Sequence, residues 1–199
     1  MPTIYDLKPK FQQLLQPIVD KLAVAGYTPN QITLSALIIS IIYGGLLAYA
    51  PSNIELLLLL PIVLLIRMAL NAIDGLLARQ QKMETKLGLL INELSDIISD
   101  TVLYLPFALI VNAYAPLVII IVILSIVAET TGILAIVTSH HRAYNGPMGK
   151  SDRAFTFGLL AILLAFNTPT YLINSLLAIT MVLLLLTIIN RCKAALSSD

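Results

Sequence analysis

Apolar runs close to 20 residues long recur along almost the whole of this 199-residue chain. In helical form, at 1.5 Å per residue, such a run crosses a hydrocarbon core of roughly 30 Å. Only 12% of the residues are charged, whereas an ordinary soluble domain is roughly a quarter charged. The sequence therefore predicts an all-α integral membrane protein in which one membrane domain uses nearly the whole chain.

The runs predict six transmembrane helices preceded by an N-terminal interfacial amphipathic helix. Residues 3–24 mix apolar side chains with lysines and aspartates, which is typical of a helix lying on the membrane surface. Gly26, Pro29 and Asn30 then predict a turn. The six spans are expected at 31–50, 53–80, 86–113, 116–138, 153–167 and 169–190. As a single domain over 1–199, the chain would comprise a juxtamembrane helix and loop at 1–30, a six-helix bundle at 31–190 and a cytoplasmic tail at 191–199.

Lys and Arg residues fall on one side of the predicted bundle. The turns near 51–53, 113–115 and 167–170 contain none, whereas the terminal segments and the other connections contain several. Because these residues are retained on the cytoplasmic side, both termini are expected in the cytoplasm. We expect a bacterial inner membrane.

Two consecutive helices carry polar residues at intervals that place them on one face. On the helix at 53–80 this face consists of Arg67, Asn71, Asp74 and Ala78, edged by Gly75 and Arg79. On the helix at 86–113 it consists of Gly88, Asn92, Asp96 and Asp100, edged by Glu93 and Ser99. A short connection makes the two helices antiparallel neighbours, so the polar faces should meet just inside the cytoplasmic surface.

Carboxylate and amide oxygens without His or Cys favour a hard cation, Mg²⁺ or Mn²⁺. Such an ion would share a phosphate-bearing substrate, whose oxygens suit basic side chains. The basic candidates facing the same compartment are Arg79, Arg142, Lys150 and Arg153. For Arg142, simple positive-inside anchoring is an equal alternative.

The candidate site also includes small residues, and charged residues that lie deeper in the predicted membrane helices. Gly75, Ala78 and Gly88 would let a nucleotide approach the helix backbone, although tight helix packing explains each of them equally well. Arg67 and Glu129 lie deeper, where an unpaired charge is costly. We predict that Arg67 pairs with Glu129 or Asp100, in a structural role.

The segment DGLLAR, eight further residues and GLLINELSD resemble the signature of the CDP-alcohol phosphotransferases, D-x-x-D-G-x-x-A-R, eight residues, then G-x-x-x-D-x-x-x-D. The matching residues are Asp74, Gly75, Ala78, Arg79, Gly88 and Asp96. TPNQIT and GKSDRA also resemble recurring family segments. The resemblance implies transfer of a phosphatidyl group from CDP-diacylglycerol to an alcohol with release of CMP, in phospholipid biosynthesis. It also implies a homodimer embedded in membrane lipid, and no nucleic-acid partner is expected.

Two positions depart from the family pattern, because Asn71 and Asn92 stand where aspartates are usual. In the family the four acidic positions hold two divalent ions, and the last of them, here Asp96, is the general base. An Asn oxygen still binds a hard cation but brings no negative charge, which Glu93 and Asp100 are candidates to restore. The candidate metal ligands are therefore Asn71, Asp74, Asn92, Glu93, Asp96 and Asp100.

Other classes of function remain open from the sequence. A relative that has lost the chemistry would bind lipid or nucleotide without catalysis. Membrane carboxylates also mark transporters, although polar groups gathered toward one face argue against a conduit. The acceptor stays open among glycerol phosphate, inositol phosphate, serine and a second lipid.

Overall fold

Helices make up nearly all of the computed structural model, which describes residues 4–197, with side chains from Lys10 onward. The elements are α1 (Ile4–Val24), α2 (Pro29–Tyr49), α3 (Ile54–Gln81), α4 (Lys86–Tyr104), the 3₁₀ helix η1 (Leu105–Leu109), α5 (Ala115–Ser139), α6 (Lys150–Ala165) and α7 (Thr170–Leu196). Residues 1–3 of the predicted juxtamembrane segment and residues 198–199 of the predicted tail lie outside the described residues.

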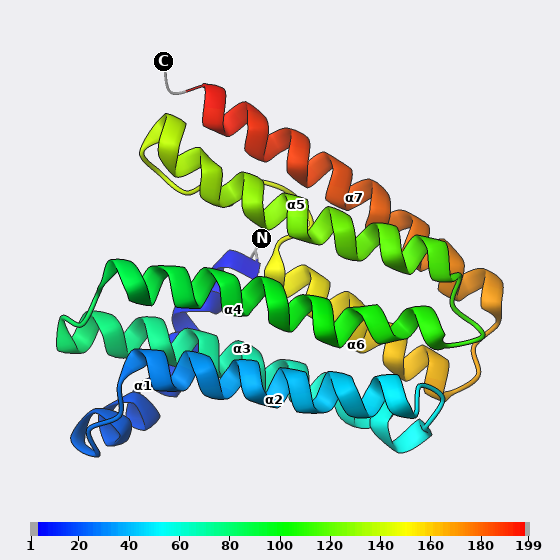
Figure 1. Ribbon diagram of the computed structural model, residues 1–199, viewed down its shortest axis with the longest axis horizontal. Helices are drawn as coiled ribbons and strands as arrows, with labels where there is room; N and C mark the ends of the chain where they lie inside the picture. The colour runs from blue at the N-terminus through cyan, green and yellow to red at the C-terminus, as the bar shows by residue number, and fades with distance from the viewer. Residues whose placement is uncertain (1–3, 198–199) are drawn as a thin grey trace.

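The helices α2 to α7 form one bundle of elongated, roughly antiparallel helices (Figure 1). Within it, α2 packs against both α3 and α4, α3 packs against α6, and α5 packs along α7. The three connections without Lys or Arg gather at one end of the bundle (Figure 1). The fold therefore puts the basic connections on a common side, as the charge pattern predicted.

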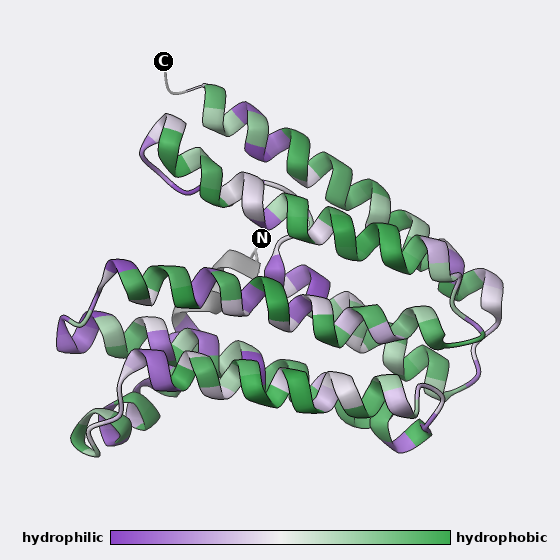
Figure 2. Cartoon of the chain, in the orientation of Figure 1, coloured by the Kyte–Doolittle hydropathy of each residue, from purple (hydrophilic) through white to green (hydrophobic). Residues whose placement is uncertain are grey.

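Among the residues that the structure describes, four helices, α2, α3, α5 and α7, are long and apolar enough to cross a membrane. Figure 2 shows hydrophobic residues along most of their length, while hydrophilic residues gather near the α3–α4 turn and at the start of α6. The other two bundle helices differ because α4 carries acidic residues and α6 has only 16 residues. An all-α membrane fold is thus supported, and spanning by α4 and α6 stays a prediction.

The third predicted span is shorter than expected. We predicted one helix over 86–113, but α4 ends at Tyr104 and the chain continues as η1, with Pro106 in its first turn. Proline has no N–H and its ring clashes with the preceding turn, so it ends an α-helix locally. At the other end of the chain, α7 continues to Leu196, beyond the predicted limit of 190.

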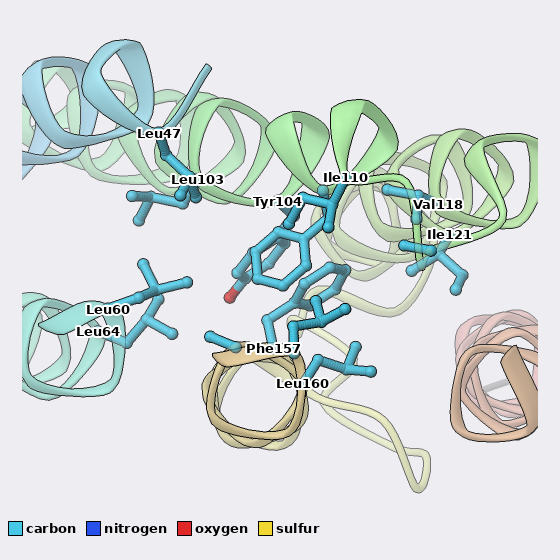
Figure 3. Close-up of a cluster of buried hydrophobic side chains, with 14 of the residues drawn as sticks. Leu47, Leu60, Leu64, Leu103, Tyr104, Ile110, Val118, Ile121, Phe157 and Leu160 are labelled. Carbon is cyan, nitrogen blue, oxygen red and sulfur yellow. The ribbon is translucent and has the colours of Figure 1, made fainter. Parts of the chain in front are cut away.

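The hydrophobic core is formed by side chains from all of the helices α2 to α7, and Figure 3 shows the part of it around Tyr104 and Phe157. The ring of Tyr104 stacks on that of Phe157 with centroids 4.0 Å apart, and Phe107 contacts Phe157 edge-on at 5.1 Å. The backbones of α2 and α4 also approach each other closely. A Cβ built on Gly44 of α2 would lie 2.2 Å from the carbonyl oxygen of Val102, so only glycine fits there.

The N-terminal helix α1 runs at an angle to the bundle (Figure 1) and packs against α3. Its buried residues Leu15 and Val19 join Ile32, Ile73 and Leu77 in a small separate core. This apolar face and the exposed opposite one agree with the predicted amphipathic helix. Its position at a membrane surface stays a prediction.

Candidate active site

Asp74 lies on the buried side of α3, where α2 supplies its hydrogen-bond donor. The hydroxyl of Thr33 donates to Asp74 Oδ2 at 2.7 Å. Thr33 was not among the predicted site residues, although it belongs to the buried face of α2, at helical spacing with Pro29, Ala36 and Ser40. The contact fixes the orientation of one Asp74 oxygen and joins α2 to the candidate site.

Asp96 on α4 is the point where the two predicted polar faces meet. Its Oδ1 accepts from the Asn71 amide and, at 3.4 Å, from the Arg67 guanidinium. Its Oδ2 accepts from the Lys150 ammonium at the start of α6. The prediction that these two helices are direct neighbours is wrong, because α2 packs against both of them. Their polar faces meet only through side chains, Asn71 and Arg67 of α3 with Asp96 of α4.

Asp100, one turn deeper than Asp96, lies between two arginines. Arg67 forms an ion pair with Asp100 Oδ1, and Arg153 contacts Oδ2 at 2.7 Å. The side chains of both arginines are at most 1% exposed. The predicted pairing of Arg67 with Asp100 is confirmed, and its alternative partner Glu129 is bound elsewhere.

Glu129 on α5 gathers three arginines from different parts of the chain. Arg142 and Arg153 contact it at 2.8 and 2.9 Å, and Arg191 lies at 3.4 Å while donating to the Ala128 carbonyl at 2.5 Å. Arg191 was not among the predicted site residues. Its place on the buried stripe of α7, after Thr180, Leu184 and Thr187, was the signal that it faces inward.

Of the four basic residues predicted to bind phosphate, Arg142, Lys150 and Arg153 are paired with carboxylates. Arg142 contacts Glu93 as well as Glu129, and the ring of Tyr144 lies 5.0 Å from its guanidinium. Burial lowers the pKa of Arg142 from its ordinary value, because desolvation disfavours the charged form. Lys150 binds Asp96 and Arg153 binds Asp100, as described above. In this structure their charge is offset by the chain itself.

The small residues of the motif differ in their surroundings. A Cβ on Gly75 would meet nothing within 4 Å, whereas one on Gly88 would lie 3.1 Å from oxygens of Asn30 and Thr85. The space beside Gly75 agrees with close approach of a ligand, and the surroundings of Gly88 agree with tight packing. Ala78 is half-buried, and Arg79, one residue further along α3, is exposed.

The oxygen donors of α3 and α4 fit a hard divalent cation in kind. Asp74 and Asp96 provide carboxylates that are buried, and the neighbouring Asn71 and Asn92 amides are half-buried. Glu93 and Asp100, the acids expected to restore charge, are instead bound to arginines. Within the part of the chain that the structure describes, no three His, Cys, Asp or Glu side chains form a ready metal-binding group. The set therefore offers two carboxylates and two amides.

Comparisons with known proteins agree with the motif. A model of the CDP-alcohol phosphatidyltransferase family matches residues 26–189. Inner membrane protein YnbA of Escherichia coli (strain K12) is 48% identical over 195 residues, covering 98% of this chain and 96% of its own length. An uncharacterised protein of Aquifex aeolicus (strain VF5) is 33% identical over 109 residues, which is 55% of this chain and 52% of that protein.

Solved structures share the fold at lower sequence identity. Phosphatidylinositol phosphate synthase PgsA1 of Mycobacterium tuberculosis with CDP-DAG bound has a TM-score of 0.75 at 18% identity, covering 92% of this chain and 94% of that one. The same enzyme in complex with manganese and citrate has a TM-score of 0.74 at 19% identity, covering 90% and 87%. The family model covers most of the chain and its motif residues include Asp74 and Asp96, so this chain belongs to the CDP-alcohol phosphatidyltransferase family.

Proposed function

We propose that the protein transfers a phosphatidyl group from CDP-diacylglycerol to a hydroxyl of an alcohol acceptor, with release of CMP, in phospholipid biosynthesis. The observation that carries this proposal is the burial of Asp74 and Asp96, from the two halves of the motif, with the cationic side chain of Lys150 bound to Asp96. Family membership supports a transferase acting on CDP-activated alcohols. The fold neighbour with CDP-DAG bound supports the choice of donor.

A divalent cation, Mg²⁺ or Mn²⁺, belongs to this proposal, since the fold neighbour PgsA1 forms a complex with manganese. Asp74 and Asp96, with the amides of Asn71 and Asn92, would hold it. When bound, it would offset negative charge on the donor diphosphate and on the leaving CMP. The chain contributes the space beside Gly75, where the nucleotide can approach the helix without meeting a side chain.

Asp96 is the proposed general base. The acceptor hydroxyl would give its proton to the Asp96 carboxylate while its oxygen bonds to the lipid-bearing phosphorus, and the bond from that phosphorus to CMP breaks. A base needs a free oxygen within roughly 3 Å of the hydroxyl. Arg67 is buried and fixed by two aspartates, whereas the Lys150 side chain is 27% exposed. Lys150 is thus the partner that can move to admit the acceptor.

Arg79 is the proposed contact for phosphate oxygens of the donor. It lies exposed near the end of α3, and no ion pair engages it among the residues with described side chains. Arg142, Lys150 and Arg153 can bind a phosphorylated acceptor only by exchanging their present carboxylate partners.

The remaining features of the proposal concern location and assembly. Both termini and the site would face the cytoplasm, with α1 on the membrane surface and α2 to α7 spanning a bacterial inner membrane as a single domain. The name of the relative YnbA as an inner membrane protein supports this membrane. A homodimer is part of the proposal and is tested by the mass of the protein in a membrane-mimetic particle.

The direct test is CMP release from CDP-diacylglycerol by purified protein with Mg²⁺ or Mn²⁺ and a panel of alcohols. Asp96→Asn should abolish release, whereas Asp20→Asn, on the exposed side of α1, should leave it unchanged. Release that requires both the metal and one alcohol identifies the acceptor. Release that persists in Asp96→Asn would remove Asp96 from its role as base.

A non-catalytic lipid- or nucleotide-binding protein is the second candidate. Asn71 and Asn92 in place of aspartates, and the occupation of both Asp96 oxygens by donors of the chain, favour it. Binding of CDP-diacylglycerol without CMP release for any acceptor would select this candidate. Movement of substrate across sealed vesicles would instead indicate a transporter.

A further inference from the structure

Three arginines from different parts of the chain converge on the carboxylate of Glu129. Arg142 lies in the connection between α5 and α6, Arg153 lies on α6, and Arg191 lies near the end of α7. Their guanidinium nitrogens are 2.8, 2.9 and 3.4 Å from the Glu129 oxygens. Guanidinium groups bind carboxylates and phosphates through the same planar set of donors. Three of them around one centre have the chemistry of an oxyanion site, and in this structure Glu129 occupies it.

The three guanidinium groups offer more donors than one carboxylate can use. The buried Nε atoms of Arg142 and Arg191 have no hydrogen-bond acceptor within the described residues. Each guanidinium has five N–H donors, whereas a carboxylate has two oxygens and a phosphate group has three strong acceptors. The surroundings of Glu129 therefore suit a phosphate in donor number, although the chain supplies the anion itself.

Glu129 is fixed at the centre of this group. It is 4% exposed and lies on the buried face of α5. The connection that carries Arg142 is held as well, because the Ala143 N–H donates to the Gly132 carbonyl of α5 at 3.1 Å. Separating Glu129 from the arginines would leave buried charges without their partner, which is strongly unfavourable. An incoming anion therefore cannot displace Glu129 at low cost.

The arginines around Glu129 lie beside the proposed base. Arg142 also binds Glu93, three residues before Asp96 on α4. Arg153 also binds Asp100, four residues after Asp96. Positions three and four residues apart share one face of a helix. An alcohol whose hydroxyl reaches Asp96 would therefore bring a phosphate on a neighbouring carbon close to these arginines.

Charge prevents such a phosphate from binding there. A phosphate monoester carries close to two negative charges at neutral pH, and the Glu129 carboxylate would repel it in a region that water solvates poorly. Each arginine also has a second acceptor in the chain: Glu93, Asp100 or the Ala128 carbonyl. An alcohol without a phosphate group needs no positive charge from these side chains and meets no such repulsion.

From this occupation we propose that Glu129 is a specificity-determining residue that excludes phosphate, so that the acceptor is an alcohol without a phosphate monoester. The inference rests on the proposed transferase function and names the class of its acceptor. Glycerol phosphate and inositol phosphate, which the sequence left open, are excluded, whereas serine and the unphosphorylated alcohols glycerol and inositol stay compatible with the site.

The first test is binding of inorganic phosphate, measured by isothermal titration of the full protein in lipid nanodiscs without substrate. Glu129→Ala removes the carboxylate and leaves its place between the arginines free, so its affinity for phosphate should exceed that of the wild type by at least about tenfold. Glu84→Ala, the same change at an exposed acid, should bind as the wild type does. Equal affinities of the wild type and folded Glu129→Ala would overturn the inference.

Thermal unfolding of the same samples gives a second measurement of phosphate binding. Phosphate at roughly 100 times its dissociation constant should raise the melting temperature of Glu129→Ala by about 5–10 °C, whereas chloride of equal ionic strength should not. If Glu129→Ala does not fold, Glu129→Gln takes its place, because it keeps the shape and removes the charge. The same gain in phosphate affinity is expected, and its absence would overturn the inference.

CMP release from CDP-diacylglycerol by the wild type separates this inference from the proposed function. Release is expected with an unphosphorylated alcohol and not with glycerol phosphate or inositol phosphate. Release with either phosphorylated acceptor would keep the transferase and reject the role of Glu129. No release with any acceptor, together with a gain of phosphate binding in Glu129→Ala, would reject the transferase and keep the exclusion of phosphate by Glu129.

Discussion

Asp100→Asn should destabilise the protein more than any other substitution of a single acid on α4, because Asp100 joins two buried arginines. The side chains of Arg67 and Arg153 are 1% and 0% exposed, and both bind this one carboxylate. Asparagine keeps the shape but removes the charge. Asp96 and Glu129 remain as partners of the two arginines, so one positive charge is left without compensation.

The cost of removing one partner of a buried ion pair is about 3–5 kcal/mol. For a chain of this size 1 kcal/mol shifts the melting temperature by about 2–4 °C, so the expected decrease is on the order of 10 °C. The assay is thermal unfolding of the detergent-solubilised protein, followed by the fluorescence of a thiol probe on the exposed Cys192 or by circular dichroism.

Asp74→Asn is the matched control, because it makes the same change in a buried acid without a described basic partner. The Thr33 hydroxyl can still donate to the asparagine oxygen, so the melting temperature should change by the equivalent of less than about 1 kcal/mol, while CMP release is lost. A decrease as large as that of Asp100→Asn would contradict the view that the cost comes from the buried arginines left without their partner. Adding Arg67→Gln to Asp100→Asn should restore part of the loss, because it removes the uncompensated charge; no recovery would refute the electrostatic explanation.

The other predictions concern glycines and a helix cap. Gly44→Ala should cost roughly 1–3 kcal/mol or more by forcing α2 from the Val102 carbonyl, whereas Gly45→Ala, with nothing within 4 Å, should be neutral in the same thermal assay. Gly75→Ala should leave the melting temperature unchanged and weaken binding of CDP-diacylglycerol, measured by isothermal titration; unchanged binding would mean that the nucleotide does not approach there. Thr85→Ala should cost about 1 kcal/mol, since Thr85 Oγ1 accepts from the Gly88 N–H at the start of α4 at 2.9 Å.

Sequence periodicity predicted most of the architecture because each bundle helix is a long apolar run bounded by turn residues. The observed helix ends differ from the predicted ones where a local feature, such as a proline or a helix cap, overrides the apolar pattern. Pro106 ended α4 early, and the Asp152 side chain accepts from the Gly149 N–H at 2.9 Å, so α6 starts at Lys150 rather than at 153. Proline had been visible in the sequence, but hydrophobicity alone does not show whether it bends a span or ends it.

The site was less predictable because its contacts join helices that are distant in sequence. The spacing of residues along the helices placed Asp74 and Asp96 on polar faces. The energetic cost of an unpaired charge in the membrane predicted that Arg67 forms an ion pair. The sequence could not show whether Asp100 or Glu129 is the partner of Arg67. It also could not show that Lys150 binds Asp96, which lies 54 positions earlier in the chain. Thr33 and Arg191 were missed because each was assigned to its apolar span or basic end instead of to the buried stripe of its helix.

Depth along α4 explains why two aspartates one turn apart have different partners. Asp100 lies beside fully buried arginines, where a carboxylate must be paired permanently. Asp96 lies one turn nearer the α3–α4 connection, and one of its partners is the 27% exposed Lys150, which water can solvate when it moves away. The inner ion pairs hold α3, α4, α5 and α6 together without any ligand, so Asp96 can exchange partners during a reaction while the bundle that positions it stays fixed. A carboxylate that can exchange partners, as Asp96 can, is suited to act as a base. We therefore predict that substitution of Asp96 reduces activity more than stability, whereas substitution of Asp100 reduces stability more than activity.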